Sequence, residues 1–319
     1  MGEREQPSNL LIKLSHRLFK EAGDRDQFIQ HLTQPTVYNT CLLWRDPRPQ
    51  DRPFVVEPPL FWQPPFVDRL APGQRPGQHA LHAAGAYYCL DFSSVFAISS
   101  LLAIAKPIDL VLDMCASPGG KSVFAWVALQ PQLLLSNEVI GKRMAQLLSN
   151  LKRCRIHPAI ALRLDSKILA EAIPNTLPLV LVDAPCSGQS LLAKGGKAPG
   201  CFHPVTIKNN ASRQKRILAN AAQIVAPGGY IAYTTCTYSP EENEQVVEWL
   251  IKKFPCFQPV KVEHLQDFQS QLVDFPCYRI FPQSGLGAGA FSVLLQNSES
   301  GEPAVISPDF LTQPGMITL

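Results

Sequence analysis

Positions 110–122 read Leu-Val-Leu-Asp-Met-Cys-Ala-Ser-Pro-Gly-Gly-Lys-Ser, an apolar run that ends in an acid and then turns through a proline and two glycines. The apolar run predicts a strand, and the apolar residues after Lys121 predict a helix. A strand, a tight loop and a helix in this order open a nucleotide-binding α/β unit. The glycines let the backbone approach a ligand, and the first N–H groups of the helix are available to an anion.

Three interpretations of this loop compete. Gly120-Lys121-Ser122 resembles the end of a Walker A loop, but Cys115 stands where that motif needs its first glycine. The dinucleotide pattern G-x-G-x-x-G is absent as well. Asp113, which closes the strand, fits a loop that surrounds the methionine part of S-adenosylmethionine. The remaining alternative is a plain strand-to-helix turn without a ligand.

Strand and helix patterns alternate after residue 85. Strands are predicted at residues 110–113, 133–136, 160–162, 179–183 and 230–235, with helices over 123–129, 144–151, 217–225 and 246–254 and a buried helix over 95–104. The segments 257–262, 278–281 and 291–295 are candidate closing strands. This alternation indicates a mostly parallel sheet that is covered by helices on both faces.

The flanking regions differ from this pattern. Leucines at helical spacing predict helices within residues 1–35, whereas residues 47–76 are too rich in proline for regular helix. We expect the aromatic residues there to pack on the main domain, and base stacking by one of them is the alternative: Phe54, Phe61, Trp62 and Phe66. The predicted division is an N-terminal segment over 1–85, a catalytic domain over 86–296 and a loosely held polar tail over 297–319.

Composition restricts the class of protein. The 319 residues are 46% hydrophobic and 17% charged, which predicts a globular fold, and no apolar run is long enough for a membrane span. No basic and apolar leader opens the chain, so we expect a cytoplasmic protein. The nine cysteines include no C-x-x-C pair, so we expect free thiols and no metal site.

The net charge of +3 is unevenly distributed. No acidic residue lies between Glu138 and Asp165 or between Ala184 and Pro240, although each interval contains six Lys or Arg residues that we count in the sequence. Charge runs of this kind are most often solvated surfaces. Two acid-free blocks beside a candidate site nevertheless favour a polyanionic partner.

Two cysteines follow predicted strands at the edge where ligands gather in such sheets. The strand over 179–183 continues into Asp183-Ala184-Pro185-Cys186, and the strand over 230–235 continues into Cys236. Each thiol alone is more often an inert buried group. Adjacent parallel strands lie about 4.8 Å apart, so the two thiols face one cleft if their strands are neighbours, and a chemical role is then favoured.

These motifs together resemble the RNA cytosine-5 methyltransferases, a family of bacterial rRNA enzymes and eukaryotic Sun-domain relatives. The resemblance covers roughly residues 85–295 and rests on the loop over 113–121, Ser136-Asn137-Glu138, the segment 183–188, and Thr235-Cys236-Thr237 with its Glu-Asn-Glu follower. It implies a class I methyltransferase (Rossmann-like) α/β fold with a mostly parallel seven-stranded sheet and a small N-terminal extension. It also implies an RNA partner, with rRNA favoured over tRNA and DNA a minor alternative.

The resemblance assigns roles to four residues. Cys236 is the nucleophile that adds to carbon 6 of cytosine, and Cys186 assists release of the product. Asp183 bonds to the cytosine edge, and Lys121 lies near the base. A solvated lysine at the start of a helix is the alternative for Lys121. A non-catalytic RNA-binding or ribosome-assembly factor is the rival to the enzyme as a whole.

The resemblance also implies S-adenosylmethionine as the cofactor. Glu138 is expected at its ribose hydroxyls, and Asp165 at its adenine, with a structural loop acid as the alternative for Asp165. Asp183 borders the same site. The methionine end is assigned to the loop residues Cys115, Ala116, Ser117, Pro118, Gly119, Gly120 and Lys121.

Three positions depart from the family pattern. Leu90 replaces a common Gln, Ala290 replaces the first Phe of a Gly-Phe-Phe motif, and Ser117 replaces a common Ala. None of them belongs to the proposed chemistry, although Leu90 and Ala290 are expected to change the wall of the cleft. The short N-terminal segment leaves the selection of the target open.

Overall fold

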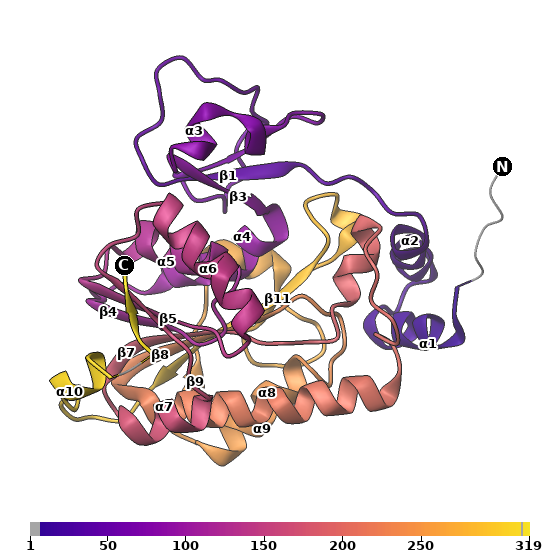
Figure 1. Cartoon of the computed structure of the whole chain (residues 1–319). Coiled ribbons are helices and arrows are strands. Elements are labelled where there is room, and N and C mark those ends of the chain that lie inside the picture. Colours follow the sequence, from indigo (N-terminus) through magenta and orange to yellow (C-terminus); the bar gives the residue numbers. More distant parts are fainter. Residues whose placement is uncertain (1–6, 314) are drawn as a thin grey trace.

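The strand that opens the nucleotide-type unit, β4 (Leu110–Asp113), lies at the centre of a large sheet (Figure 1). The computed structural model describes residues 7–313 and 315–319, so the expected helices within 1–35 are tested only from residue 7. β4 pairs in parallel with β5 (Leu133–Asn137) and β7 (Leu177–Asp183). Its residues after Leu110 are buried because helices cover both faces of the sheet, as the apolar run predicts.

The sheet contains nine strands rather than the expected seven. Its order is β10 (Tyr278–Ile280), β11 (Ala290–Asn297), β8 (Val225–Thr235), β7, β4, β5, β6 (Ala159–Leu162) and β12 (Ile317–Thr318), and β9 (Phe257–Pro259) pairs with β11. The strands β4 to β8 are mutually parallel, whereas β9 to β12 pair antiparallel with their neighbours. The two additional strands, β9 and β12, are very short and extend the α/β class I methyltransferase arrangement without changing it.

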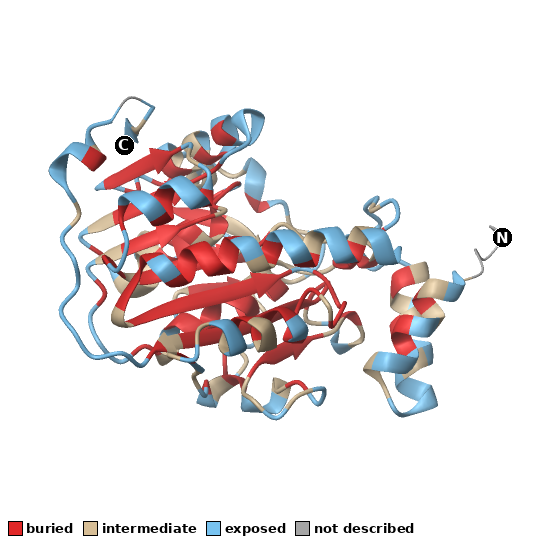
Figure 2. Ribbon diagram, turned by 90° about the horizontal axis from the view of Figure 1, so that it is seen from below, coloured by how far each residue is buried: buried red, intermediate tan, exposed pale blue. Residues whose placement is uncertain are grey.

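Helices cover both faces. One face carries α4 (Phe92–Ile98), α5 (Gly120–Leu129) and α6 (Gly141–Arg153), and the other carries α7 (Ser166–Ala172), α8 (Pro204–Ile224) and α9 (Glu244–Lys253) (Figure 1). Two apolar clusters fill the layers between helices and sheet, and Figure 2 shows the strands buried beneath helices whose outer sides are exposed. Helix α7 was not predicted, because it forms barely two turns.

Strand β8 begins earlier than the sequence predicts. The strand is predicted over 230–235, but α8 ends at Ile224, and β8 begins at Val225 and includes Gly228 and Gly229. The ladder to β7 shifts register between Leu177 and Leu179, and Gly228 has a φ of 68°. An irregular ladder of this kind accommodates glycine with positive φ, so the glycines mark a bulge rather than a helix end.

The N-terminal region contains two helices and a small sheet. Helices α1 (Asn9–Leu18) and α2 (Ala22–Thr33) are followed by the antiparallel strands β1 (Thr40–Trp44), β2 (Val67–Arg69) and β3 (Tyr87–Asp91), with the short α3 (Ala80–Ala83) between the last two. The helices confirm the leucine pattern, but the sheet was not predicted. It joins residues on both sides of position 85, and the division into domains at that position stays a prediction.

Two of the four aromatic residues in the proline-rich segment pack on the main domain as expected, because Trp62 stacks on Phe92 and Phe66 contacts Phe124. Phe54 instead contacts Tyr87 of the small sheet. Phe61 differs, because 71% of it is exposed.

The described chain also contains five short 3₁₀-helices, at Pro76–Gln78, Ser99–Ala103, Gln189–Lys194, Glu263–Phe268 and Pro282–Ser284.

The expectation of a loosely held tail is wrong for its last residues. Helix α10 (Pro308–Leu311) buries Phe310 in the apolar cluster under α7 and α8, and β12 adds an edge strand to β6. The polar composition of residues 297–319 does not reveal these contacts, because only one aromatic side chain and a two-residue strand anchor the segment. In the described part of the chain, no helix is both long and apolar enough to span a membrane.

Candidate active site

The two thiols that follow β7 and β8 lie in contact. The strands are parallel neighbours with Asp183 opposite Thr234, so the chain leaves both at the same edge of the sheet. The Sγ atoms of Cys186 and Cys236 are 3.3 Å apart, and Cys236 is exposed. The predicted proximity of these residues is therefore confirmed.

Lys121 and Asp183 form an ion pair beside the thiols. Nζ of Lys121 lies 2.7 Å from Oδ2 of Asp183, and the hydroxyl of Thr234 donates to Oδ1 at 2.9 Å. Only 13% of the lysine side chain is exposed, so a solvated lysine at the start of α5 is the wrong interpretation. Burial lowers the pKa of Lys121, but the charge of Asp183 outweighs it and raises the pKa overall.

The surroundings favour a thiolate on Cys236. A hydrogen bond from the Cys186 thiol lowers the pKa of Cys236 against the effect of burial, and the charge of Lys121 acts in the same direction. The pKa of Cys186 is raised by that same hydrogen bond and by burial. The pair therefore carries its first negative charge on Cys236, while Cys186 remains a thiol that donates.

A buried carboxylate, Glu242, holds the two cysteine loops together. Its Oε1 accepts from the backbone N–H of Ser187 at 2.8 Å, and its Oε2 accepts from the Ser187 hydroxyl at 2.6 Å. Gln214 of α8 donates to the same carboxylate at 3.1 Å, and the Ser187 hydroxyl also meets that of Thr237 at 2.7 Å. Burial raises the pKa of Glu242 despite these donors. The sequence analysis named Glu242, Ser187 and Thr237 only as parts of motifs, without a role, and it missed Gln214.

The loop after β4 is fixed by hydrogen bonds to its own flanking elements and to α6. Asp113 is fully buried and accepts from the Ser122 hydroxyl at 2.7 Å, and burial raises its pKa to about 6. Asn150 of α6 donates to the carbonyl of Pro118 at 2.8 Å, and the Ser117 hydroxyl donates to the carbonyl of Arg143 at 3.0 Å.

Two glycines let this loop close on its surroundings. Gly119 precedes α5 with a φ of 111°, which L side chains rarely adopt. A Cβ on Gly120 would lie 2.5 Å from Leu90, so the position that departs from the family pattern packs directly on the loop.

A cavity of about 230 Å³ adjoins the loop and is bordered by the ends of β4 to β7. It brings together three predicted cofactor residues, Cys115, Glu138 and Asp165. Asp165 is also the N-cap of α7, because its Oδ1 accepts from the Lys167 N–H at 2.9 Å. Asp165 therefore has the structural role that was its alternative, and it lines the cavity as well. The loop residues Ala116, Ser117, Pro118, Gly119 and Gly120 do not line this cavity.

Glu138 carries an unused acceptor in this cavity. It is 3% exposed, and its Oε1 accepts from the Ile140 N–H at 2.9 Å. Its Oε2 has no hydrogen-bond donor in the described structure, although Nη1 of Arg143 lies 3.4 Å away. A buried carboxylate oxygen without a donor is costly, and a ligand hydroxyl would satisfy it.

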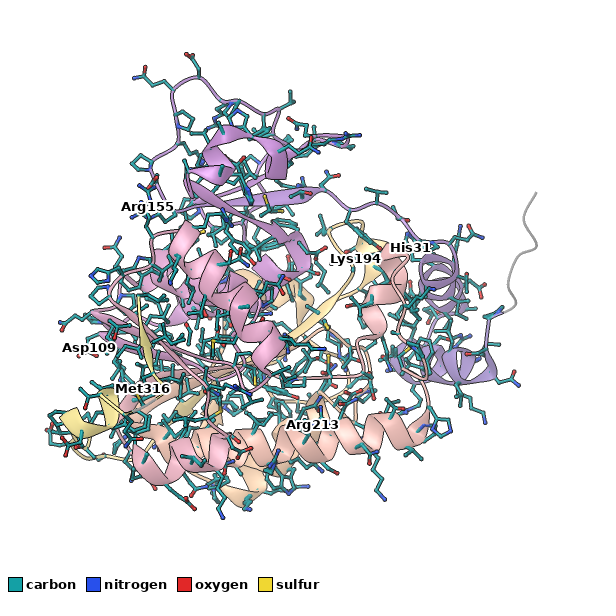
Figure 3. The ribbon with its side chains drawn as sticks, viewed as in Figure 1. His31, Asp109, Arg155, Lys194, Arg213 and Met316 are labelled. Atoms are coloured by element: carbon teal, nitrogen blue, oxygen red, sulfur yellow. The ribbon has the colours of Figure 1, made fainter. Side chains whose placement is uncertain are left out.

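Several lining residues escaped the sequence analysis. Arg143, Arg213 and Arg216 border the cavity, and Arg213 is labelled on α8 in Figure 3. Asn137 ties the ends of β4 and β6 together by donating to the carbonyls of Met114 and Leu164. The acid-free blocks pointed to the arginines, but nothing in the sequence indicated which of them face inward.

Comparisons with known proteins agree with this arrangement. Residues 101–296 match the family model described as 16S rRNA methyltransferase RsmB/F. The chain is 31% identical over 232 residues to ribosomal RNA small subunit methyltransferase F of Cronobacter sakazakii, a match that covers 71% of this chain and 48% of the relative. The corresponding protein of Serratia proteamaculans is 29% identical over 260 residues, with 80% and 54% covered. The chain thus spans about half the length of these curated relatives.

Solved structures show the same fold. The crystal structure of NSun6 from Pyrococcus horikoshii with SFG has a TM-score of 0.69 at 16% identity and covers 92% of this chain and 99% of that one. A methyltransferase homolog from Pyrococcus horikoshii has a TM-score of 0.68 at 19% identity, with 91% and 99% covered. The expected cofactor, S-adenosylmethionine, agrees with membership of a methyltransferase family. By its family match, the chain belongs to the RsmB/F family of 16S rRNA methyltransferases.

Proposed function

We propose that this protein transfers a methyl group from S-adenosylmethionine to carbon 5 of cytosine in ribosomal RNA, through a covalent adduct on Cys236. The contact between Cys236 and Cys186, 3.3 Å from sulfur to sulfur, carries the proposal. Carbon 5 of cytosine is too weak a nucleophile to accept a methyl group unaided. A thiolate that adds to carbon 6 converts the ring into an enamine, which is reactive at carbon 5.

Cys236 is the better nucleophile of the two. Its pKa is lowered and it is exposed, whereas the pKa of Cys186 is raised. The sulfur of Cys236 would form a bond to carbon 6, and carbon 5 would then take the methyl group as the methyl–sulfonium bond of the bound cofactor breaks and a neutral thioether, S-adenosylhomocysteine, leaves. A proton then leaves carbon 5 for solvent, the sulfur–carbon bond breaks and the thiolate returns. The Cys186 S–H is placed to donate a hydrogen bond to that departing thiolate.

Asp183 and Lys121 support the addition. The carboxylate of Asp183, oriented by Thr234, is the acceptor that we assign to the edge of the cytosine ring, where it favours the protonated ring as sulfur adds. Lys121 keeps this carboxylate in place and adds a positive charge near the thiolate. Positive charge beside a cysteine favours its ionised form.

The cavity beside the thiols fits S-adenosylmethionine. We assign the unsatisfied Oε2 of Glu138 to the ribose hydroxyls, because a carboxylate at the end of the second strand accepts from both. Asp165 borders the cavity on the side that we assign to the adenine, and Cys115 borders it on the side that we assign to the methionine end. The rest of the loop, from Ala116 to Lys121, does not line the cavity. When bound, the cofactor supplies an electrophilic methyl group. The residues of this chain position it against the base.

The experiment is a methyl-transfer assay with labelled S-adenosylmethionine and 16S rRNA, followed by mass spectrometry of the nucleosides. We expect 5-methylcytidine from the parent protein and none from Cys236→Ala, with tRNA methylated less than rRNA. A different methylated nucleoside would contradict the proposal. Binding of RNA and S-adenosylmethionine without any methyl transfer would instead support the non-catalytic assembly factor.

A further inference from the structure

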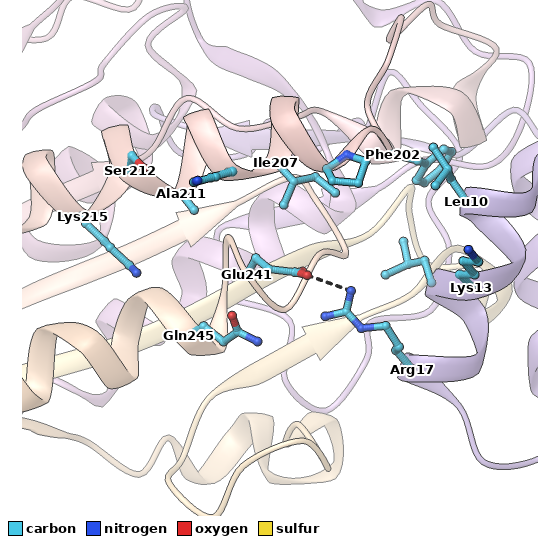
Figure 4. Close-up of a pocket in the computed structure, with 13 residues that line it drawn as sticks. Leu10, Lys13, Arg17, Phe202, Ile207, Ala211, Ser212, Lys215, Glu241 and Gln245 are labelled. Atoms are coloured by element: carbon cyan, nitrogen blue, oxygen red, sulfur yellow. Dashed lines mark ion pairs between the residues drawn. The ribbon is translucent and has the colours of Figure 1, made fainter.

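A second hollow lies outside the candidate active site, between α1 and α8. It has a volume of about 600 Å³, and Glu241 of the loop that follows Cys236 and Gln245 of α9 also line it (Figure 4). Neither the cofactor residues nor the catalytic candidates line it. The proposed chemistry therefore does not explain this groove.

Positive side chains surround the groove on both helices. Lys13 and Arg17 lie one turn apart on α1, and Lys208 and Lys215 lie two turns apart on α8, so each pair shares one side of its helix. Figure 4 shows Lys215 and Arg17 extending into the groove from its two walls. Glu241 is the acid among the lining residues, and it is paired with Arg17 at 2.8 Å. The remaining cations favour an anionic occupant.

Apolar side chains also line the groove, and they include an aromatic ring. Phe202 is half-buried and lines the groove together with Leu14, Ile207 and Ala211. A groove with cations on both walls and an aromatic ring in its lining is the arrangement that binds single-stranded nucleic acid, because the phosphates contact the cations and a base stacks on the ring. The second acid-free block of the sequence contributes both Lys208 and Lys215.

Hydrogen bonds link the groove to the two cysteine loops. Glu241 directly precedes Glu242, which binds the Ser187 backbone next to Cys186. On the other side, the carbonyl of Cys201, next to Phe202, accepts from Gln189, and Gln189 accepts from the N–H of Tyr238. The groove is therefore joined through these hydrogen bonds to the loops that carry Cys186 and Cys236.

We propose that this groove binds the RNA strand that directly flanks the target cytidine, with its phosphates on Lys13, Lys208 and Lys215 and one base against Phe202. The inference rests on the proposed function, which identifies the RNA. It adds the place on the protein where the nucleotides next to the target cytidine bind. It assigns the selection of single-stranded targets to α1 and α8.

The test compares Lys208→Gln/Lys215→Gln with the parent protein and with Lys106→Gln. The amino group of Lys106 lies 2.6 Å from the Gly228 carbonyl at the start of β8, at the edge of the sheet opposite Cys236. Binding of a fluorescent single-stranded RNA with one central cytidine is measured by anisotropy over a salt series. We expect the double variant to bind about tenfold more weakly and its salt slope to fall by roughly 1.4, because each single-strand phosphate contact contributes about 0.7. Lys106→Gln is expected to match the parent.

A photo-crosslink locates the strand independently. An RNA with 4-thiouridine beside the target cytidine should crosslink to the peptide that contains Phe202, and Phe202→Ala should lose this crosslink. Parental affinity and slope in the double variant, or a crosslink elsewhere, would overturn the inference. Neither RNA binding nor the photo-crosslink depends on catalysis. If both results are as expected but no methyl transfer is found, only the proposed function is rejected. Unchanged binding of S-adenosylmethionine in the double variant confirms that its fold is intact.

Discussion

At the scale of single residues, the coupling of two thiols defines the candidate chemistry. Cys186 donates to Cys236, so the charge forms first on the exposed sulfur, which has access to a substrate. Lys121 and Asp183 lie beside it as an ion pair with opposing effects, because the charge of Asp183 raises the pKa of Cys236 and the charge of Lys121 lowers it. The proposed nucleophile is thus activated by a neighbour of the same residue type rather than by a histidine.

This coupling predicts a shift in reactivity. Cys186→Ala removes the donor, so the pKa of Cys236 should rise, while Cys186→Ser should cause a smaller rise because a hydroxyl still donates. The rate of iodoacetamide alkylation at the Cys236 peptide, followed by mass spectrometry against pH, measures this pKa. Lys121→Met should raise it as well. Identical pH profiles in all these proteins would refute the coupling.

Asp113 predicts a pH-dependent stability. Burial raises its pKa from 3.8 to about 6, so the native state favours the protonated acid. Its stabilising contribution is complete below the unfolded pKa and is lost as the pH rises through about 6. Asp113→Asn lacks this loss, so its free energy of unfolding relative to the parent should increase by up to about 3 kcal/mol between pH 4 and pH 7. Denaturant titrations at both pH values measure it, and a constant difference would contradict the explanation.

At the scale of elements, the ends of β7 and β8 are held by two buried carboxylates, one just before α9 and one at its first residue. Glu242 fixes the Cys186 loop, and Glu244 pairs with Arg279 of β10, which also donates to the carbonyl of Tyr238 at 2.9 Å. Sequence reasoning placed the two cysteines together because strand ends follow from local patterns. It missed the partners of the carboxylates because Gln214 and Arg279 come from elements distant in sequence.

The buried pair of Glu244 and Arg279 predicts an asymmetric response to mutation. Arg279→Met leaves the Glu244 carboxylate buried without its partner, so the free energy of unfolding should fall by about 3–5 kcal/mol. Arg279→Met/Glu244→Gln should recover part of this loss. The exposed pair of Lys261 and Glu263 is the control, since Lys261→Met should cost less than about 1 kcal/mol. Equal losses from both single variants in denaturant unfolding would contradict this view.

At the scale of the whole molecule, the parallel strands and their covering helices could be predicted, whereas the peripheral parts could not. Continuous apolar runs such as β4 and β7 indicate buried strands without further information. Residues 41–44 form an equally apolar run, but nothing local shows that they pair with residues 87–90, far along the chain. The two-residue β12 has no pattern of its own and forms only because β6 offers an edge.

The docking of the tail predicts a stability effect. Phe310 is 3% exposed, so Phe310→Ala should lower the free energy of unfolding by about 3–5 kcal/mol. Val305 in the same tail is 91% exposed, and Val305→Ala should stay within about 0.5 kcal/mol of the parent. Thermal unfolding of the two variants distinguishes a docked tail from a loose one, for which both substitutions would be neutral.

The most direct test of the mechanism is the capture of the RNA adduct. Cys186→Ala is incubated with 16S rRNA and S-adenosylmethionine at mildly alkaline pH, and the denatured protein is analysed for bound RNA and for the modified peptide. We predict an adduct on Cys236 that accumulates because release is slowed, and none in Cys186→Ala/Cys236→Ala. An adduct in Cys236→Ala but not in Cys186→Ala would contradict the account, because sulfur 186 would then be the one that attacks the base.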